Sequence, residues 1–111
     1  MATTKDFADF ILSQLSDECV ASCRKMFGEY ALYSKNKVVA LICDNQLYVK
    51  PTDAGKAFIG DYVEGIAYPK AKPSLLIQDQ IEDGEWLSEL ILITEKELPN
   101  PKPKKIKTKN E

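Results

Sequence analysis

Histidine is absent from this chain of 111 residues. Its absence excludes nucleophile pairs of serine or cysteine with histidine, and every metal site that needs an imidazole ligand. Enzymes that rely on carboxylates, lysine, tyrosine or cysteine are not excluded, but the sequence contains no convergent set of such residues. We therefore expect a small binding or regulatory module without enzymatic activity.

Long apolar runs are also absent. The longest, from Val38 to Cys43, has six residues, whereas a helix that spans a bilayer needs about 20. Near the N-terminus, Asp6 and Asp9 interrupt the stretch in which a signal peptide would have its apolar region. We expect no membrane association and a cytoplasmic location.

Cysteine is scarce, with only Cys19, Cys23 and Cys43. An odd number of cysteines in a chain without an export signal argues against a disulfide framework. The spacing of Cys19 and Cys23 suggests half of a metal clip, but neither a second pair nor a histidine is present to complete it. We expect three reduced, buried thiols, no metal ion and no cofactor.

Positive and negative charges are unevenly distributed along the chain. Residues 1–100 carry 10 basic and 16 acidic side chains, a net charge of −6, and the last eleven residues carry a net charge of +4. An acidic body binds DNA poorly because phosphate contacts supply most of the non-specific affinity. Nucleic acid is therefore an alternative partner that only the tail would hold, through Lys102, Lys104, Lys105, Lys107 and Lys109. A solubilising terminus is the simpler interpretation of these lysines.

Hydrophobic periodicity predicts an amphipathic helix over residues 4–16, with Thr3 or Thr4 as its cap. The residues on its apolar arc are Phe7, Ala8, Phe10, Ile11, Leu12 and Leu15.

A second helix is predicted over residues 82–98, with Asp83 as its cap. Glu95 falls on the polar side of this helix, and so does Leu92, which has no predicted role in the core. Trp86 lies at the edge of the apolar arc. We single out Trp86 and Leu92, together with the region around Gly28, as a candidate surface for protein contact, including contact between two copies of the chain.

Alternating apolar and polar residues predict an antiparallel meander in residues 29–50. Lys35-Asn36 and Asp44-Asn45 are two-residue turns, because asparagine tolerates a positive φ. Further elements are predicted as strands at 20–25 and 75–77, a short helix at 53–62 with Ala57, Phe58 and Tyr62 inward, and a loop at 63–73. The expected fold class is α+β: a mainly antiparallel sheet of about 4–5 strands, with an N-terminal and a C-terminal helix packed on it.

The domain organisation follows from the prolines near the C-terminus. Pro99, Pro101 and Pro103 are incompatible with both a helix and a central strand. We expect one folded domain at residues 1–98 and a disordered tail, rich in proline and lysine, at residues 99–111.

Three tyrosines of the predicted sheet have two interpretations. Tyr30, Tyr33 and Tyr48 could form a platform on which nucleic-acid bases stack. Aromatic residues of a half-buried sheet more often belong to the core, and we favour that interpretation.

One segment carries a resemblance to a known family. Residues 25–33, Lys-Met-Phe-Gly-Glu-Tyr-Ala-Leu-Tyr, resemble the Arg/Lys-Met-Phe-Gly-Gly-Tyr-Gly-Leu-Tyr signature of the TfoX/Sxy N-terminal domain family. The likeness continues through the predicted strands and helices from about residue 7 to residue 98. Glu29 and Ala31 depart from it, since the family often has glycine there. The matching residues are Lys25, Met26, Phe27, Gly28, Tyr30, Leu32 and Tyr33.

The resemblance implies an α+β fold and kinship with regulators of competence for DNA uptake. In the longer family members a second, C-terminal domain follows this one, and we expect it to be missing here. No catalytic residues are carried over from the family. We expect a stand-alone, non-enzymatic domain that acts by contact with a protein partner of unknown identity, a homodimer being one form of that contact.

Overall fold

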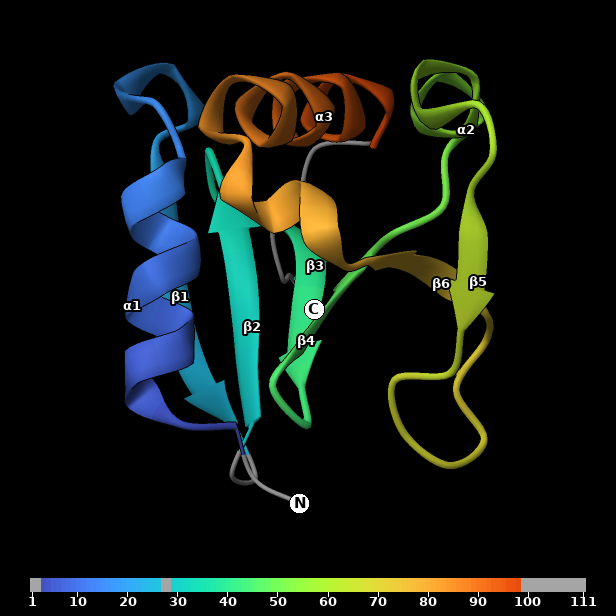
Figure 1. The fold of residues 1–111 in the computed structure, drawn as a ribbon. Helices are drawn as coiled ribbons and strands as arrows, with labels where there is room; N and C mark the ends of the chain where they lie inside the picture. Colours follow the sequence, from blue (N-terminus) through green and yellow to red (C-terminus); the bar gives the residue numbers. More distant parts are fainter. Residues whose placement is uncertain (1–2, 27–28, 99–111) are drawn as a thin grey trace, which may run out of the picture.

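The computed structural model describes residues 3–26 and 29–98, and Figure 1 shows their fold. The predicted tail at 99–111 and the motif residues Phe27 and Gly28 lie outside the described residues. In chain order the elements are α1 (Lys5–Gln14), the 3-10 helix η1 (Asp17–Cys19), β1 (Ala21–Met26), β2 (Glu29–Ser34), β3 (Lys37–Cys43), β4 (Gln46–Val49), α2 (Asp53–Ile59), β5 (Val63–Gly65), β6 (Ser74–Ile77), the 3-10 helix η2 (Asp79–Glu82) and α3 (Gly84–Glu97).

The strands form one antiparallel sheet in the order β1-β2-β3-β4-β6-β5. The predicted α+β fold class is confirmed, but the sheet has six strands and is therefore larger than expected. The additional strand is β5, which lies in the segment predicted as a loop. Its three residues are too few to show an alternating pattern, and it exists because it pairs with β6.

Both predicted two-residue turns are confirmed. Lys35 and Asn36 have φ values of 50° and 70°, and Asp44 and Asn45 have values of 52° and 55°. Positive φ at both central residues matches the right-handed twist of the flanking strands, so such turns join antiparallel neighbours tightly. They fix the register of β2, β3 and β4, and with it the face of the sheet on which each side chain lies.

The first helix begins as predicted and ends two residues early. The Thr4 hydroxyl accepts a hydrogen bond from the Phe7 backbone at 3.2 Å, which caps the N-terminus of α1. Ala8 and Ile11 are buried, whereas Phe10, which we expected on the apolar arc, is 38% exposed. The buried face of this helix is therefore narrower than the predicted arc.

The short helix α2 ends at Ile59, before the predicted Tyr62, because Gly60 leaves the helix with a φ of 83°. Ala57 and Tyr62 are exposed, so of the three residues predicted inward only Phe58 packs against the core; its ring centroid lies 5.4 Å from that of Trp86. Gly55 is buried where α2 meets α3. A Cβ there would lie 2.8 Å from the Thr52 hydroxyl that caps α2.

The long helix α3 packs on β2 and β3, on the same side of the sheet as α1 (Figure 1). The Asp83 cap is confirmed by a hydrogen bond from the Trp86 backbone at 3.2 Å. The predictions for two residues were wrong. Leu92 is half-buried and packs against the core, and Glu95 is only 8% exposed. Leu92 lies beside the end of α1 and Glu95 contacts Lys37 of β3, so the buried arc of α3 is wider than the periodicity alone indicates.

Glu95 is buried because it pairs with Lys37, whose ammonium lies 2.7 Å from the Glu95 carboxylate. The same ammonium donates hydrogen bonds to the backbone carbonyls of Glu95 at 2.8 Å and of Leu98 at 2.9 Å. Its three donors are thus matched by three acceptors, two of which are carbonyls at the C-terminus of α3 that lack helical partners. The negative end of the helix dipole adds to this attraction.

We predict that Lys37→Met lowers the free energy of unfolding by about 3 kcal/mol, because it leaves the Glu95 carboxylate buried without a partner. Urea denaturation followed by the fluorescence of Trp86 measures the change. Lys35→Met is the matched control, since Lys35 is half exposed and its ammonium lies 3.8 Å from Glu95; a loss below about 0.5 kcal/mol is expected there. Equal losses for the two variants would contradict the role assigned to Lys37.

Candidate functional site

The two faces of the sheet have different surroundings. On one face Leu32, Ile42, Val49 and Leu75 are fully buried beneath the helices. On the opposite face, which α1 and α3 do not cover (Figure 1), the strands leave half-buried apolar side chains such as Leu41. We call this second side the open face.

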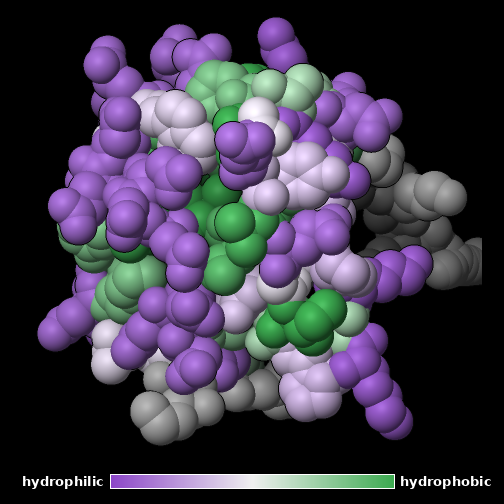
Figure 2. Space-filling view, turned by 45° about the vertical axis from the view of Figure 1, so that its right-hand side comes forward, coloured by the Kyte–Doolittle hydropathy of each residue, from purple (hydrophilic) through white to green (hydrophobic). Residues whose placement is uncertain are grey.

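Hydrophobic side chains are also exposed at the edge of the open face. They lie in β5 and on either side of it, where Tyr62, Val63, Ile66 and Tyr68 are each at least 40% exposed. On the side of the molecule that carries β5 and β6, hydrophobic residues reach the surface among polar ones (Figure 2). Apart from Tyr62, which was predicted inside the short helix, these residues belong to the segment 63–73 predicted as a loop, and the segment forms a wall beside the central strands.

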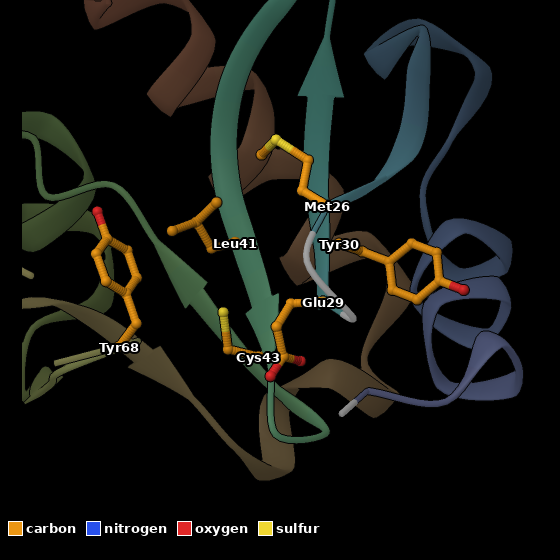
Figure 3. A pocket seen from close by; sticks show the side chains of 6 residues that line it. All are labelled: Met26, Glu29, Tyr30, Leu41, Cys43 and Tyr68. Carbon is orange, nitrogen blue, oxygen red and sulfur yellow. The ribbon is translucent and has the colours of Figure 1, made fainter. Parts of the chain in front are cut away.

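A pocket of about 570 Å³ lies between the sheet and that wall (Figure 3). Met26 projects into it from β1, Leu41 and Cys43 project into it from β3, and the ring of Tyr68 faces them from the loop. Glu29 lies at one end, and the ring of Tyr30 points away, toward α1. Met26 is 41% exposed and Tyr68 is 55% exposed, so both side chains are accessible from outside.

A second pocket of about 520 Å³ adjoins the first and shares Leu41 and Tyr68 with it. Its other lining residues are Tyr48, Lys50, Pro51, Ala67, Lys70, Ala71, Lys72, Pro73, Ser74 and Leu98. We call the two pockets together the open-face groove.

The thiols near the sheet are poor nucleophiles. Burial, and then the carboxylates of Glu29 and Asp44, raise the pKa of the Cys43 thiol. On the helix side, burial and then Asp9 raise the pKa of Cys23 to about 11. Because the thiolate is the reactive form, both cysteines remain protonated and weakly reactive at neutral pH. The groove can bind apolar side chains, but it presents no activated thiol.

The Glu29 side chain links the N-terminal segment to the sheet by hydrogen bonds. Burial acts to raise the pKa of its carboxyl, but hydrogen bonds outweigh burial and lower the pKa below its usual range. The Thr3 hydroxyl donates at 2.6 Å, the Thr3 amide at 2.9 Å and the Asp44 amide at 3.1 Å. The side chain thus bridges the N-terminal segment and the turn between β3 and β4.

Comparison with known proteins identifies the family. The model of the TfoX N-terminal domain matches residues 13–96. The chain belongs to the TfoX N-terminal domain family. It is also 41% identical over 109 residues to a protein of Spirochaeta aurantia described as an uncharacterised 12.7 kDa protein in the trpE 5' region. That match covers 98% of this chain and 95% of the relative.

The described residues of the TfoX motif do not gather at one site. Leu32 is buried in the core and Tyr30 packs against it, both on the helix side. On the open face, Met26 lines the groove and the ring of Tyr33 lies under the Arg24 guanidinium, 5.7 Å away. Lys25 is exposed on β1. The described motif residues therefore lie on the paired strands β1 and β2, and among them Met26 and Tyr30 line the groove.

The other predicted site residues lie away from the open-face groove. Trp86 packs against Phe58, and Leu92 borders a recess between the end of α1 and the side of α3. Their role as a contact between two copies stays a prediction. The tail lysines lie outside the described residues.

Sequence analysis missed the loop side of the groove, namely Tyr68 with Lys70 and Lys72. A signal was present, because Ile66-Ala67-Tyr68 is an apolar cluster within a segment otherwise typical of a surface loop.

Neither a metal site nor a membrane span emerges from the described parts of the chain. No group of three or more cysteine, aspartate or glutamate side chains among these residues could hold a metal ion. None of the described helices is both long and apolar enough to cross a bilayer.

We predict that Glu29→Gln lowers the free energy of unfolding by about 1 kcal/mol at pH 7, because uncharged acceptors form weaker hydrogen bonds. The folded-state pKa of Glu29 lies below its usual value of 4.5. The carboxylate therefore contributes stability above about pH 4.5, and this contribution is lost as the pH falls through the folded-state pKa. Urea denaturation at pH 7, 4.5 and 3 should show that the free energy of unfolding falls less steeply with decreasing pH in the variant than in the unsubstituted protein.

Glu82→Gln is the control, because Glu82 is exposed and lies outside this network. A pH dependence of Glu29→Gln that matches that of the unsubstituted protein would contradict the assignment.

Proposed function

We propose that this protein is a non-enzymatic regulatory domain that acts by contact with another protein through the open-face groove. The observation that carries the proposal is the uncovered sheet face, where Met26, Leu41 and Tyr68 surround an accessible apolar pocket. Accessible apolar surface that a fold leaves uncovered is typical of a site of protein contact. Membership of the TfoX N-terminal domain family supports a regulatory role.

The chemistry of the groove supports binding rather than catalysis. Glu29 is the acidic residue that lines it, and hydrogen bonds from Thr3 and Asp44 stabilise its charged form. A general acid or base works best with a pKa near the working pH, whereas these bonds lower the pKa of Glu29. The Cys43 thiol is held in its protonated form.

To test the proposal, we would replace Tyr68 with a photo-crosslinking phenylalanine analogue in cells that naturally contain the protein. Tyr68 is expected to yield an adduct with one defined protein, and Met26→Glu should weaken the binding of that protein, once purified, by at least tenfold. Phe10 is the matched control, since it is aromatic, 38% exposed and located on α1.

Identical adducts from positions 68 and 10, or no protein adduct from position 68, would refute contact through the open face. An adduct with a second copy of the chain would identify a homodimer formed through the groove rather than through Trp86 and Leu92.

A second candidate function is association with nucleic acid through the lysine tail. The observation that favours it is the position of Leu98, which lines the groove beside three lysines just before the five lysines of the tail. An electrophoretic shift of DNA should then weaken steeply between roughly 50 and 200 mM salt. Replacing all five tail lysines with glutamine should abolish the shift. A shift that persists in this variant would exclude the tail as its cause.

A further inference from the structure

The second pocket of the open-face groove has an unusual charge for this protein. Lys50, Lys70 and Lys72 line it, and none of its lining residues is acidic. Residues 1–100 contain 16 acidic and only 10 basic side chains. A pocket lined by three lysines and no acidic residue therefore has a positive charge, opposite in sign to the net charge of these residues. A local positive potential on an acidic body steers and selects negatively charged partners.

The three ammonium groups are available for a partner. All three lysines are exposed, and no ion pair joins any of them to an acidic residue within the described ranges. Lys37, by contrast, is paired with Glu95. A carboxylate that approaches Lys50, Lys70 or Lys72 would break no ion pair between residues of the described ranges.

The loop that carries two of these lysines has a defined backbone. Its turn is closed by a hydrogen bond from the Ala71 amide to the Tyr68 carbonyl at 3.0 Å. Pro69 suits the second position of a β-turn, and the positive φ of 71° at Lys70 is typical of the third position of a type II turn. Tyr68 and Lys70 are thus held beside the sheet before any partner arrives, which reduces the entropy lost on binding.

The lining of the groove between the lysines is largely aliphatic, with Leu41, Pro51, Pro73 and Leu98. Such a surface offers no pattern of hydrogen bonds, but it accommodates leucine, isoleucine or phenylalanine side chains. We propose that the open-face groove binds a segment of a partner protein in which acidic residues alternate with large apolar ones. This inference rests on the proposed function and adds the chemistry of the partner.

Two other occupants fit the groove less well. The lysine tail carries the same charge as Lys50, Lys70 and Lys72, so electrostatic repulsion opposes its binding there. Single-stranded nucleic acid needs successive exposed aromatic rings on which bases stack. Tyr68 offers one such ring, but Tyr48 is only 8% exposed and its hydroxyl is bonded to Gln46.

Selection from a displayed library of random 12-residue peptides against the full chain tests the inference. Enriched peptides should combine aspartate or glutamate with large apolar residues. Fluorescence anisotropy of the strongest peptide should then show at least a tenfold loss of affinity for the triple variant Lys50→Glu, Lys70→Glu and Lys72→Glu. The matched control reverses one lysine on each helix, Lys5, Lys56 and Lys96, and should change the affinity less than twofold.

Circular dichroism of both triple variants establishes that they are folded before binding is compared. Peptides without an excess of acidic residues, no enrichment at all, or equal losses for the two triple variants would overturn the inference. Tighter binding of a 12-residue oligothymidine, lost in the groove variant, would assign the groove to nucleic acid instead. If these outcomes occur and Tyr68 still crosslinks to a protein, the proposed function is retained and only the inference that the partner is acidic is rejected.

Discussion

The ammonium of Lys37 joins the two layers of the fold at one point. It satisfies the carboxylate of Glu95 and two carbonyls at the end of α3, and it comes from the first residue of a strand whose position is set by a two-residue turn. The long helix is thereby fixed over one face of the sheet. Together with the buried Leu87, Leu90 and Ile91 of α3, this contact keeps that face covered and leaves the opposite face, with its groove, open.

Much of the fold could be predicted from local sequence because its signals are local. Asparagine in the turns and the hydroxyl or carboxylate caps of Thr4 and Asp83 each act on the backbone within three residues. Burial across the sheet is set by distant partners instead. Glu95 looked like a solvent-facing residue because its partner Lys37 lies 58 residues away. Neither the hydrophobic periodicity nor the composition of α3 indicates that Glu95 has a partner on β3.

The groove was missed for a related reason. Its apolar side chains, such as Met26 and Leu41, belong to strands with clear patterns, but its outer wall comes from a segment without any repeating pattern. Only the pairing of β5 with β6 brings Tyr68 opposite the sheet. The family motif was recognised correctly, yet most of its described residues build a hairpin, so recognition of the family alone did not locate the candidate site.

The order of the strands also has a consequence for how the chain folds. From β1 to β4 every strand pairs with the one that follows it in sequence, so these four strands of the sheet can assemble by closing short loops at low entropic cost. By contrast, α3 must close loops of about 60 residues to reach β3. We therefore expect the antiparallel strands β1 to β4 to form early, with the hydrophobic face of the sheet exposed until α3 packs on it. During that interval the nascent protein is most prone to aggregate.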